Sequence, residues 1–289
     1  MLHKVKVFLE MIKFEHSVFA LPFAYMGAIL GSVAAVNELP AWQDIFWVTI
    51  AMIGARSAAM GLNRVIDAAI DAKNPRTDIR AIPAGLLSKK EVLLFIVVSF
   101  VVLMYAAWQL NPLCVRLLPI AVFLLTFYSY TKRFTWACHI VLGFTIGLAP
   151  LGGWIAVTGS FDPVSLVLYL AVAFWTAGFD ILYACQDAEF DRKEGLYSIP
   201  ARFGIARALQ IARWFHAVTA VAFLALWWLI DLQWWYAAGL IVAYLILVYE
   251  HLLVKPNDLS KLDTAFFAMN GILSIVVFSF TLVDVLVIG

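Results

Sequence analysis

Residues 63–71 read Asn63-Arg64-Val65-Ile66-Asp67-Ala68-Ala69-Ile70-Asp71 and end a long apolar run with a pattern of the form NxxxDxxxD. On a helix, side chains four residues apart project from one face with about 6 Å of rise between neighbours. Carboxylates in this arrangement on a membrane helix repel each other, and burying them costs on the order of several kcal/mol. The pattern therefore indicates a cation bound between them, and we interpret that cation as Mg²⁺.

The composition is that of an integral membrane protein. Of the 289 residues, 64% are hydrophobic and 13% are charged, and the mean hydropathy is +0.92, well outside the range of a soluble globular domain. The net charge of +1 argues against a nucleic acid or another polyanionic partner. Cys114, Cys138 and Cys185 have neither metal-site nor disulfide spacing. We expect one membrane domain over residues 1–289.

Nine apolar stretches are long enough to cross the roughly 30 Å hydrocarbon core of a bilayer. Before the first of them, Val5, Phe8, Leu9 and Ile12 share one helix face, and lysines including Lys13 accompany them. Residues 1–16 are therefore expected to form an amphipathic helix at the membrane interface rather than a cleavable signal. The nine stretches cover roughly residues 17–37, 43–67, 91–110, 113–131, 137–157, 164–186, 207–230, 234–254 and 264–287.

The basic residues predict how the chain is oriented in the membrane, because Lys and Arg favour cytoplasmic loops. The N-terminus and the loops that follow the second, fourth, sixth and eighth stretches carry almost all of them, whereas the alternate loops near residues 38–42, 158–163 and 231–233 carry none. Arg116 is the only basic residue near the other side. The nine helices are therefore expected to run from a cytoplasmic N-terminus to an external C-terminus, with the loops 68–90 and 187–206 in the cytoplasm.

A second acidic set, Asp180, Asp187 and Asp191, ends the sixth apolar stretch on that same side. One interfacial aspartate is commonly explained by helix capping. Both sets here, however, fall at the C-terminal ends of helices, where the helix dipole disfavours acids. We therefore interpret the two sets as facing each other across a cavity and binding cations.

Magnesium suits such a site because it takes oxygen ligands, usually one or two carboxylates, and completes its shell with water and substrate phosphates. Two facing acidic sets could hold two or more such ions around a diphosphate. Basic side chains beside the cavity would balance the phosphate charge. The sequence supplies Arg76, Arg80, Lys132 and Lys193 for this role, and Arg56, deep in the second stretch, is expected to make a salt bridge or a phosphate contact.

Three segments together resemble the intramembrane aromatic prenyltransferases of the UbiA superfamily. These are residues 63–71 with their continuation 74–85, the segment 180–191 running into Gly195-Leu196-Tyr197-Ser198, and Tyr128-Ser129-Tyr130-Thr131-Lys132-Arg133-Phe134-Thr135. The last segment is similar to that of 4-hydroxybenzoate polyprenyltransferases. The resemblance implies a nine-helix bundle around a central cavity open to the cytoplasm and to lipid. It also implies Mg²⁺-dependent transfer of a polyprenyl chain from a prenyl diphosphate to an aromatic carboxylic acid in a bacterial inner membrane.

By matching motif positions, the resemblance also assigns roles to residues. Arg133 would hold the carboxylate of the acceptor, and Asp180 and Tyr183 would lie near the reacting centre. We expect Asp187 or Asp180 to assist deprotonation of the acceptor. By contrast, Arg64 is expected to point off the ladder face and to snorkel to the interface. The metal and diphosphate would be held by Asn63, Asp67, Asp71, Asp187 and Asp191, with Tyr128, Lys132, Arg76 and Arg80 as phosphate contacts.

The identity of the acceptor stays open at this stage. Tyr197 replaces the lysine of a Gly-x-Lys-Ser pattern found in many members, and the strings 19–22 and 198–204 look like the branch thought to act in menaquinone synthesis through the futalosine route. That branch would prenylate a dihydroxynaphthoate, whereas the 4-hydroxybenzoate type, which we favour, serves ubiquinone synthesis. The remaining alternatives are a haem-farnesylating member of the superfamily and, from another class, an ion-coupled transporter.

Overall fold

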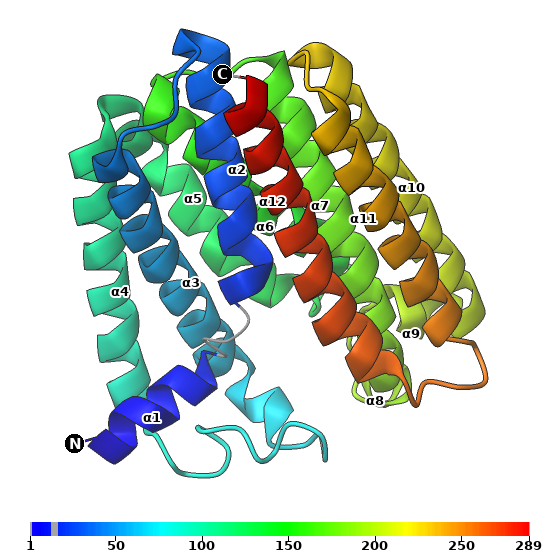
Figure 1. Ribbon diagram of the computed structural model, residues 1–289. Coiled ribbons are helices and arrows are strands. Elements are labelled where there is room, and N and C mark those ends of the chain that lie inside the picture. The colour runs from blue at the N-terminus through cyan, green and yellow to red at the C-terminus, as the bar shows by residue number, and fades with distance from the viewer. Residues whose placement is uncertain (1, 13–16, 289) are drawn as a thin grey trace.

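The computed structural model describes residues 2–12 and 17–288, and over these residues the chain is built from helices (Figure 1). The only extended pairing in this part of the chain is a two-bond backbone bridge between Lys255 and Asp258. The main helices pack side by side into a bundle. The predicted all-α fold is confirmed.

Eight of the described helices are long and apolar enough to cross a membrane, so the chain is an integral membrane protein. The helix α2 has a shorter apolar stretch, Ala20–Val36, and its crossing as a ninth span stays a prediction. Each predicted apolar stretch coincides with one long helix. These helices are α2 (Ser17–Val36), α3 (Trp42–Asp71), α4 (Lys89–Leu110), α5 (Pro112–Thr131), α6 (Cys138–Thr158), α7 (Pro163–Ala184), α10 (Ile205–Leu229), α11 (Trp234–Leu253) and α12 (Asn270–Ile288), the last preceded by a π-helical turn η3 (Thr264–Met269).

Local sequence sets the helix ends. The side chain of Asn111 accepts hydrogen bonds from the backbone nitrogens of Leu113 and Cys114, both at 3.0 Å, and Pro112 follows it as the first residue of α5. A proline is tolerated there because the first turn of a helix needs no N–H partner. Gly159 ends α6 in the left-handed conformation, with φ of 66°. Asn111 and Gly159 therefore separate the helices on either side of them.

Backbones of neighbouring helices lie in direct contact in the middle of the bundle. A Cβ added to Gly27 on α2 would lie 2.0 Å from the carbonyl oxygen of Pro150 on α6, and one added to Gly153 on α6 would lie 2.0 Å from that of Ala24 on α2. Small residues at both contacts let α2 and α6 approach this closely. The centre of the bundle is accordingly a rigid frame for the elements at its ends.

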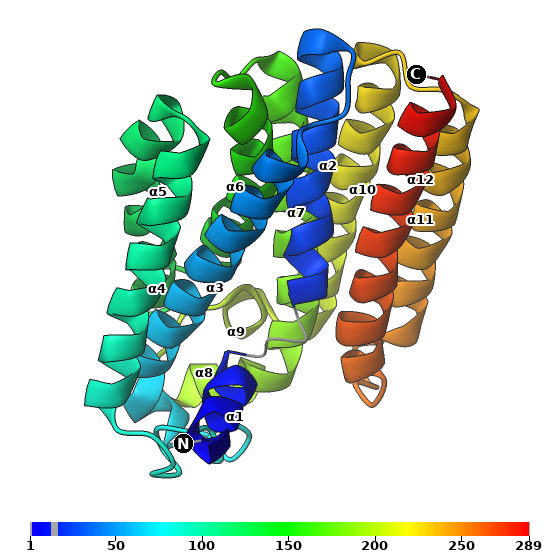
Figure 2. The ribbon, with the colours of Figure 1, turned by 60° about the vertical axis from the view of Figure 1, so that its left-hand side comes forward.

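One end of the bundle carries both acidic motifs, and we call it the motif end. The C-terminal ends of α3, α5 and α7 reach it, and the short helices α1 (Leu2–Met11), α8 (Ala188–Lys193) and α9 (Ile199–Phe203) lie across it (Figure 2). The C-terminal end of α12 lies at the opposite end of the bundle (Figure 1). Residues that are far apart in sequence therefore meet at the motif end.

Two segments at this end differ from the sequence prediction. The predicted loop 68–90 begins later, because α3 continues through Asp71. Ala68, Ala69 and Ile70 support another helical turn, and the sequence Lys73-Asn74-Pro75 follows the end of the helix. The predicted loop 187–206 contains α8 and α9. Within the predicted interfacial helix 1–16, α1 covers residues 2–11, and Lys13 lies outside the described residues.

Candidate active site

A cavity of about 780 Å³ lies at the motif end and is lined by both acidic motifs. Residues from α3, α5, α7 and the loops between them contribute to its wall. We call it the polar cavity. Twelve of the fourteen predicted site residues line it: Arg56, Asn63, Asp67, Asp71, Arg76, Arg80, Tyr128, Lys132, Asp180, Tyr183, Asp187 and Asp191.

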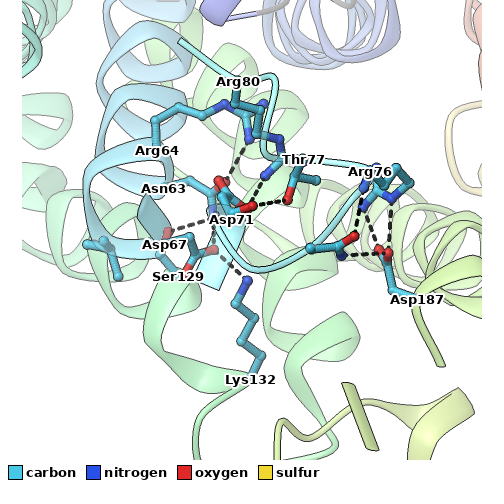
Figure 3. Close-up of polar contacts among 12 residues, drawn as sticks. Asn63, Arg64, Asp67, Asp71, Arg76, Thr77, Arg80, Ser129, Lys132 and Asp187 are labelled. Atoms are coloured by element: carbon cyan, nitrogen blue, oxygen red, sulfur yellow. Dashed lines mark hydrogen bonds and ion pairs between the residues drawn. The ribbon is translucent and has the colours of Figure 1, made fainter. Parts of the chain in front are cut away.

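Asp67 is the most heavily paired carboxylate of the first motif. Its Oδ2 lies 2.7 Å from Nζ of Lys132, and its Oδ1 accepts a hydrogen bond of 2.9 Å from Nη2 of Arg133. Asn63, one turn earlier on α3, donates from Nδ2 to Oδ2 of Asp67 at 2.9 Å (Figure 3). With 1% of its surface exposed, Asp67 depends on these partners to offset the cost of burying its charge.

Asp71, one turn further along α3, is 3% exposed, and only one of its two carboxylate oxygens is paired with a described residue. Its Oδ1 lies 2.7 Å from Nη1 of Arg80, while its Oδ2 is buried and has no hydrogen-bond partner among the described residues. The loop folds back over this position because Oγ1 of Thr77 donates to the backbone oxygen of Asp71 at 3.1 Å (Figure 3). A buried carboxylate oxygen without a partner is costly, which indicates that it serves a ligand.

Arg76 joins the two motifs. Its Nε donates to Oδ1 of Asp187 at 2.9 Å, and its Nη2 bonds the other oxygen of that carboxylate, so the pair is bidentate (Figure 3). Nη1 of Arg76 donates to the hydroxyl of Tyr183 at 3.3 Å, and Nδ2 of Asn74 donates to Asp187 at 3.1 Å. Burial would lower the pKa of Arg76, but the hydrogen bond and the charge of Asp187 outweigh it and raise that pKa. The loop after α3 thus reaches across to the end of α7.

Two predicted site residues lie outside the wall of the polar cavity. Lys193, on α8, is exposed to the surroundings. Arg133 points its guanidinium at α3 and α5, where it donates to the backbone oxygens of Ile66 and Ser129, both at 2.8 Å, besides its bond to Asp67. In this arrangement Arg133 does not line the cavity itself but holds Asp67, which does, in place.

The prediction for Arg64 is wrong. Arg64 is 8% exposed, and its Nε donates to the backbone oxygen of Met11 at the end of α1, at 3.3 Å. Successive residues are only about 100° apart around a helix, so Arg64 stays beside Asn63, and α1 covers that face. Arg64 therefore lines the polar cavity instead of reaching toward the interface.

His139 is a site residue that the sequence prediction missed. It is the second residue of α6 and is 4% exposed, and its Nδ1 lies 2.6 Å from Oδ2 of Asp180. Its place in the sequence, six residues after Arg133 and at the start of an apolar stretch, was a usable signal, because histidines are uncommon at such positions.

A second, apolar cavity of about 420 Å³ adjoins the first between α3, α4, α5 and α6. It extends to Leu110 and Phe161, at the end of the bundle opposite the motif end, and its wall is almost wholly apolar. Arg56 and Tyr128 line both cavities. The hydroxyl of Tyr128 donates to the backbone oxygen of Ala59 at 3.2 Å, which fixes the ring at the boundary between the two.

The donor set of the polar cavity fits magnesium. No three His, Cys, Asp or Glu side chains in the described part of the chain come together as a ready-made metal site. Magnesium does not require one, because it usually takes one or two protein carboxylates and fills the remaining positions with water and phosphate oxygens. The unpartnered Oδ2 of Asp71 is an oxygen of the required kind.

The fold and the site define a class: a membrane-embedded helical bundle with a charged cavity beside an apolar one, which is suited to an amphipathic ligand. The model of the UbiA prenyltransferase family matches residues 21–272, and the chain belongs to this family. It is therefore a prenyltransferase.

Named relatives agree with this assignment. The chain is 37% identical over 210 residues to the mitochondrial 4-hydroxybenzoate polyprenyltransferase of Arabidopsis thaliana, covering 72% of this chain and about half, 51%, of the plant protein. It is 32% identical to the 4-hydroxybenzoate octaprenyltransferase of Methylobacillus flagellatus, covering 80% of this chain and 79% of the relative.

Solved structures share the fold. A UbiA homolog from Aeropyrum pernix K1, solved without ligand, has a TM-score of 0.84 at 29% identity and covers 93% of this chain and 98% of its own. A UbiA homolog from Archaeoglobus fulgidus, solved bound to DMAPP and Mg²⁺, has a TM-score of 0.74 at 20% identity, with 97% and 99% coverage.

Proposed function

We propose that this protein transfers a polyprenyl chain from a prenyl diphosphate to a carboxylated phenol, 4-hydroxybenzoate, in respiratory quinone synthesis, and that the transfer depends on Mg²⁺. The observation that carries the proposal is the Arg76–Asp187 pair, because it joins the two acidic motifs across a cavity that four further lysine and arginine side chains also line. The names of the relatives support the acceptor, since they are 4-hydroxybenzoate prenyltransferases.

The polar cavity is proposed to hold the diphosphate. Asn63, Asp67 and Asp71 on one side and Asp187 and Asp191 on the other would hold Mg²⁺, which when bound would neutralise the diphosphate and make it a better leaving group. The basic side chains that are paired with these acids line the same cavity. When Mg²⁺ binds the acids instead, these side chains can turn toward the phosphate oxygens. They are Arg76, Arg80 and Lys132.

The apolar cavity is proposed to take the polyprenyl tail. Its wall offers hydrophobic burial along α3 to α6, and it meets the polar cavity at Arg56 and Tyr128. Burial of each tail carbon contributes about 0.8 kcal/mol. The reacting carbon, which joins head and tail, would therefore lie near this boundary.

The reaction breaks the bond between the allylic carbon and the diphosphate oxygen, whose electrons leave with diphosphate. The ring carbon ortho to the acceptor hydroxyl forms the new carbon–carbon bond, and the proton on that carbon is lost to water, which restores the aromatic ring. The site must exclude water from the electron-deficient allylic carbon, because water would convert it to an alcohol. Tyr183 and Phe266, whose ring centroids are 4.1 Å apart, line the cavity and can stabilise positive charge through their faces.

A dihydroxynaphthoate remains the second candidate acceptor, because Tyr197, which occupies the lysine position of the Gly-x-Lys-Ser pattern, lines the polar cavity. Membership of a prenyltransferase family weighs against the ion-coupled transporter, as does the gathering of the acids at one end of the bundle. The excess of basic residues in the loops of the motif end supports a cytoplasmic position for the site, in a bacterial inner membrane.

The test is to supply membranes containing the protein with a polyprenyl diphosphate, Mg²⁺ and one acceptor at a time, and to identify the product by mass. We expect prenylated 4-hydroxybenzoate. Prenylation of the dihydroxynaphthoate alone would show that the acceptor is the one used in menaquinone synthesis. No prenylated product with either acceptor would contradict the proposal.

A further inference from the structure

His139 joins three parts of the polar cavity. Its Nδ1 lies 2.6 Å from Oδ2 of Asp180 on α7, and its Nε2 lies 3.3 Å from the backbone nitrogen of Ile199, the first residue of α9. The imidazole lines the cavity, and it belongs to α6. One buried side chain thus connects α6, α7 and the segment 187–206, which carries the second motif.

The two contacts determine which ring nitrogen carries the hydrogen. A backbone N–H can only donate, so Nε2 of His139 accepts from Ile199 and has no hydrogen of its own. The hydrogen of the neutral ring then lies on Nδ1 and is donated to Asp180. A histidine whose second nitrogen is engaged in this way has a fixed tautomer and a fixed ring orientation.

The packing of α6 against α7 holds the pair at this distance. A Cβ added to Gly143, one turn beyond His139, would lie 2.2 Å from the carbonyl oxygen of Ala173 on α7. Gly147, one turn further, is similarly close to the backbone of Tyr169. Because the two backbones touch at both points, neither helix can slide along the other without a clash. The contact between His139 and Asp180 is therefore built into the frame of the bundle.

Asp180 is placed to use this support. It lines the polar cavity with 24% of its side chain exposed, and its Oδ1 makes no hydrogen bond with a described residue. Tyr183 follows one turn later on α7 and accepts a hydrogen bond from Arg76, which binds Asp187. Asp180 thus lies about two helical turns deeper in the bundle than Asp187, the acid of the ion pair that joins the two motifs.

We infer that His139 is a positioning residue that presents Asp180 as an oriented carboxylate, and that Asp180 accepts the hydroxyl proton of the aromatic acceptor. The inference rests on the proposed function. The proton moves from the acceptor oxygen to Oδ1 of Asp180, and the electron pair stays on the phenolate, which raises the reactivity of the ortho carbon. After that carbon has bonded to the prenyl chain and lost its own proton to water, Asp180 returns its proton to the phenolate oxygen.

A double-mutant cycle tests this role. We expect His139→Ala to lower kcat by about tenfold to a hundredfold, part of what a general base contributes, with little change in the KM for the prenyl diphosphate. If His139 acts through Asp180, adding His139→Ala to Asp180→Asn should cost nothing more. His251→Ala, at a histidine that lines neither cavity, is the matched control and should retain the activity of the wild type. Additive losses in the cycle would overturn the inference.

Amide variants keep the test decisive even where alanine destabilises the protein. His139→Asn retains an N–H close to the position of Nδ1, whereas His139→Gln retains an acceptor close to that of Nε2. We expect Asn to preserve more of kcat than Gln, and Asn performing no better than Gln would contradict the role. The outcome is separable from that of the proposed function, because the comparison uses the acceptor that the wild-type protein prenylates. A wild type without any prenylated product refutes the function itself.

Discussion

The two cavities of this protein differ in almost every physical property although they share a boundary. The polar cavity, about 780 Å³, is walled by ion pairs that involve Asp67, Asp71 and Asp187. The apolar cavity, about 420 Å³, is walled almost wholly by apolar side chains, most of them on α3, α4, α5 and α6. The first includes the helix ends and loops of the motif end, whereas the second runs between helices toward the opposite end of the bundle. The two kinds of wall match the proposed substrate, because its charged head would need the first and its apolar tail the second.

The physics of the two walls predicts different sensitivities. Each buried carboxylate in the polar cavity depends on a particular partner, and removal of one member leaves an uncompensated charge. Contacts in the apolar cavity are non-directional and scale with area. Substitutions in the polar wall should therefore affect activity strongly, whereas those in the apolar wall should change which chain lengths are accepted.

The largest effect is expected at Asp67 and Asp71. Replacing either with Asn should lower prenyl transfer by about a thousandfold or more, because the carboxylate can no longer hold Mg²⁺ against the diphosphate. Membrane insertion should be unchanged. Asp44→Asn, on the same helix but lining neither cavity, is the matched control. Retained transfer in both motif variants, measured by product mass in membranes, would refute the head-group assignment.

Metal removal should have the same effect without any mutation. Chelation by EDTA should abolish transfer, and added Mg²⁺ should restore it, because the repulsion between the diphosphate and the acidic motifs is then no longer compensated. Transfer that continues at full rate in EDTA would show that the acidic motifs do not act by binding a metal ion.

A smaller loss is expected at Arg76. Arg76→Gln removes the bidentate partner of Asp187, whose side chain is 18% exposed, and should lower kcat/KM for the prenyl diphosphate by about a hundredfold. Lys73→Gln, which breaks only the more exposed pair with Glu194, should have little effect. Equal losses in the two variants would show that the Arg76–Asp187 pair has no special role.

Arg133 distinguishes two roles for one side chain. If its guanidinium holds the acceptor carboxylate, Arg133→Ala should raise the KM for the acceptor about tenfold and leave that for the prenyl diphosphate nearly unchanged. Its contacts with Asp67 and Ile66 instead favour support of the first motif. Equal changes in both KM values would assign it to that second role.

The smallest effect is expected in the apolar cavity. A Cβ added to Gly152 would meet nothing within 4 Å, so Gly152→Phe projects its ring into the open space of this cavity. The KM should rise about fivefold for a long polyprenyl diphosphate and stay unchanged for a short one, since only the long tail loses buried area. The same change for both lengths would place the tail elsewhere.

Much of this molecule could be predicted from its sequence because membrane helices have strong signals. All nine apolar stretches coincide with helices, and the NxxxDxxxD spacing correctly placed Asn63, Asp67 and Asp71 toward one cavity. The loop charges placed the second motif at the same end. These features depend on length, periodicity and charge, which a single sequence displays directly.

Side-chain contacts between distant segments could not be predicted in this way. Arg64 is buried because α1 folds over it, and the sequence around residue 64 does not predict that contact. His139 meets Asp180 because glycines let α6 and α7 approach closely. The pairing of Arg133 with α3 likewise depends on where α5 ends relative to that helix. Each of these depends on the register between helices, which hydropathy does not encode.

The central claim is that both acidic motifs and Mg²⁺ form one binding site for a diphosphate head. The most direct measurement is the thermal stability of the purified protein with a non-reactive polyprenyl thiodiphosphate, with and without Mg²⁺, in the wild type and in Asp71→Asn and Asp187→Asn. At about 100 times its Kd the analogue should stabilise the wild type by about 2.7 kcal/mol. We predict that this gain requires Mg²⁺ and is lost in both variants. Full stabilisation without Mg²⁺, or in either variant, would contradict the claim.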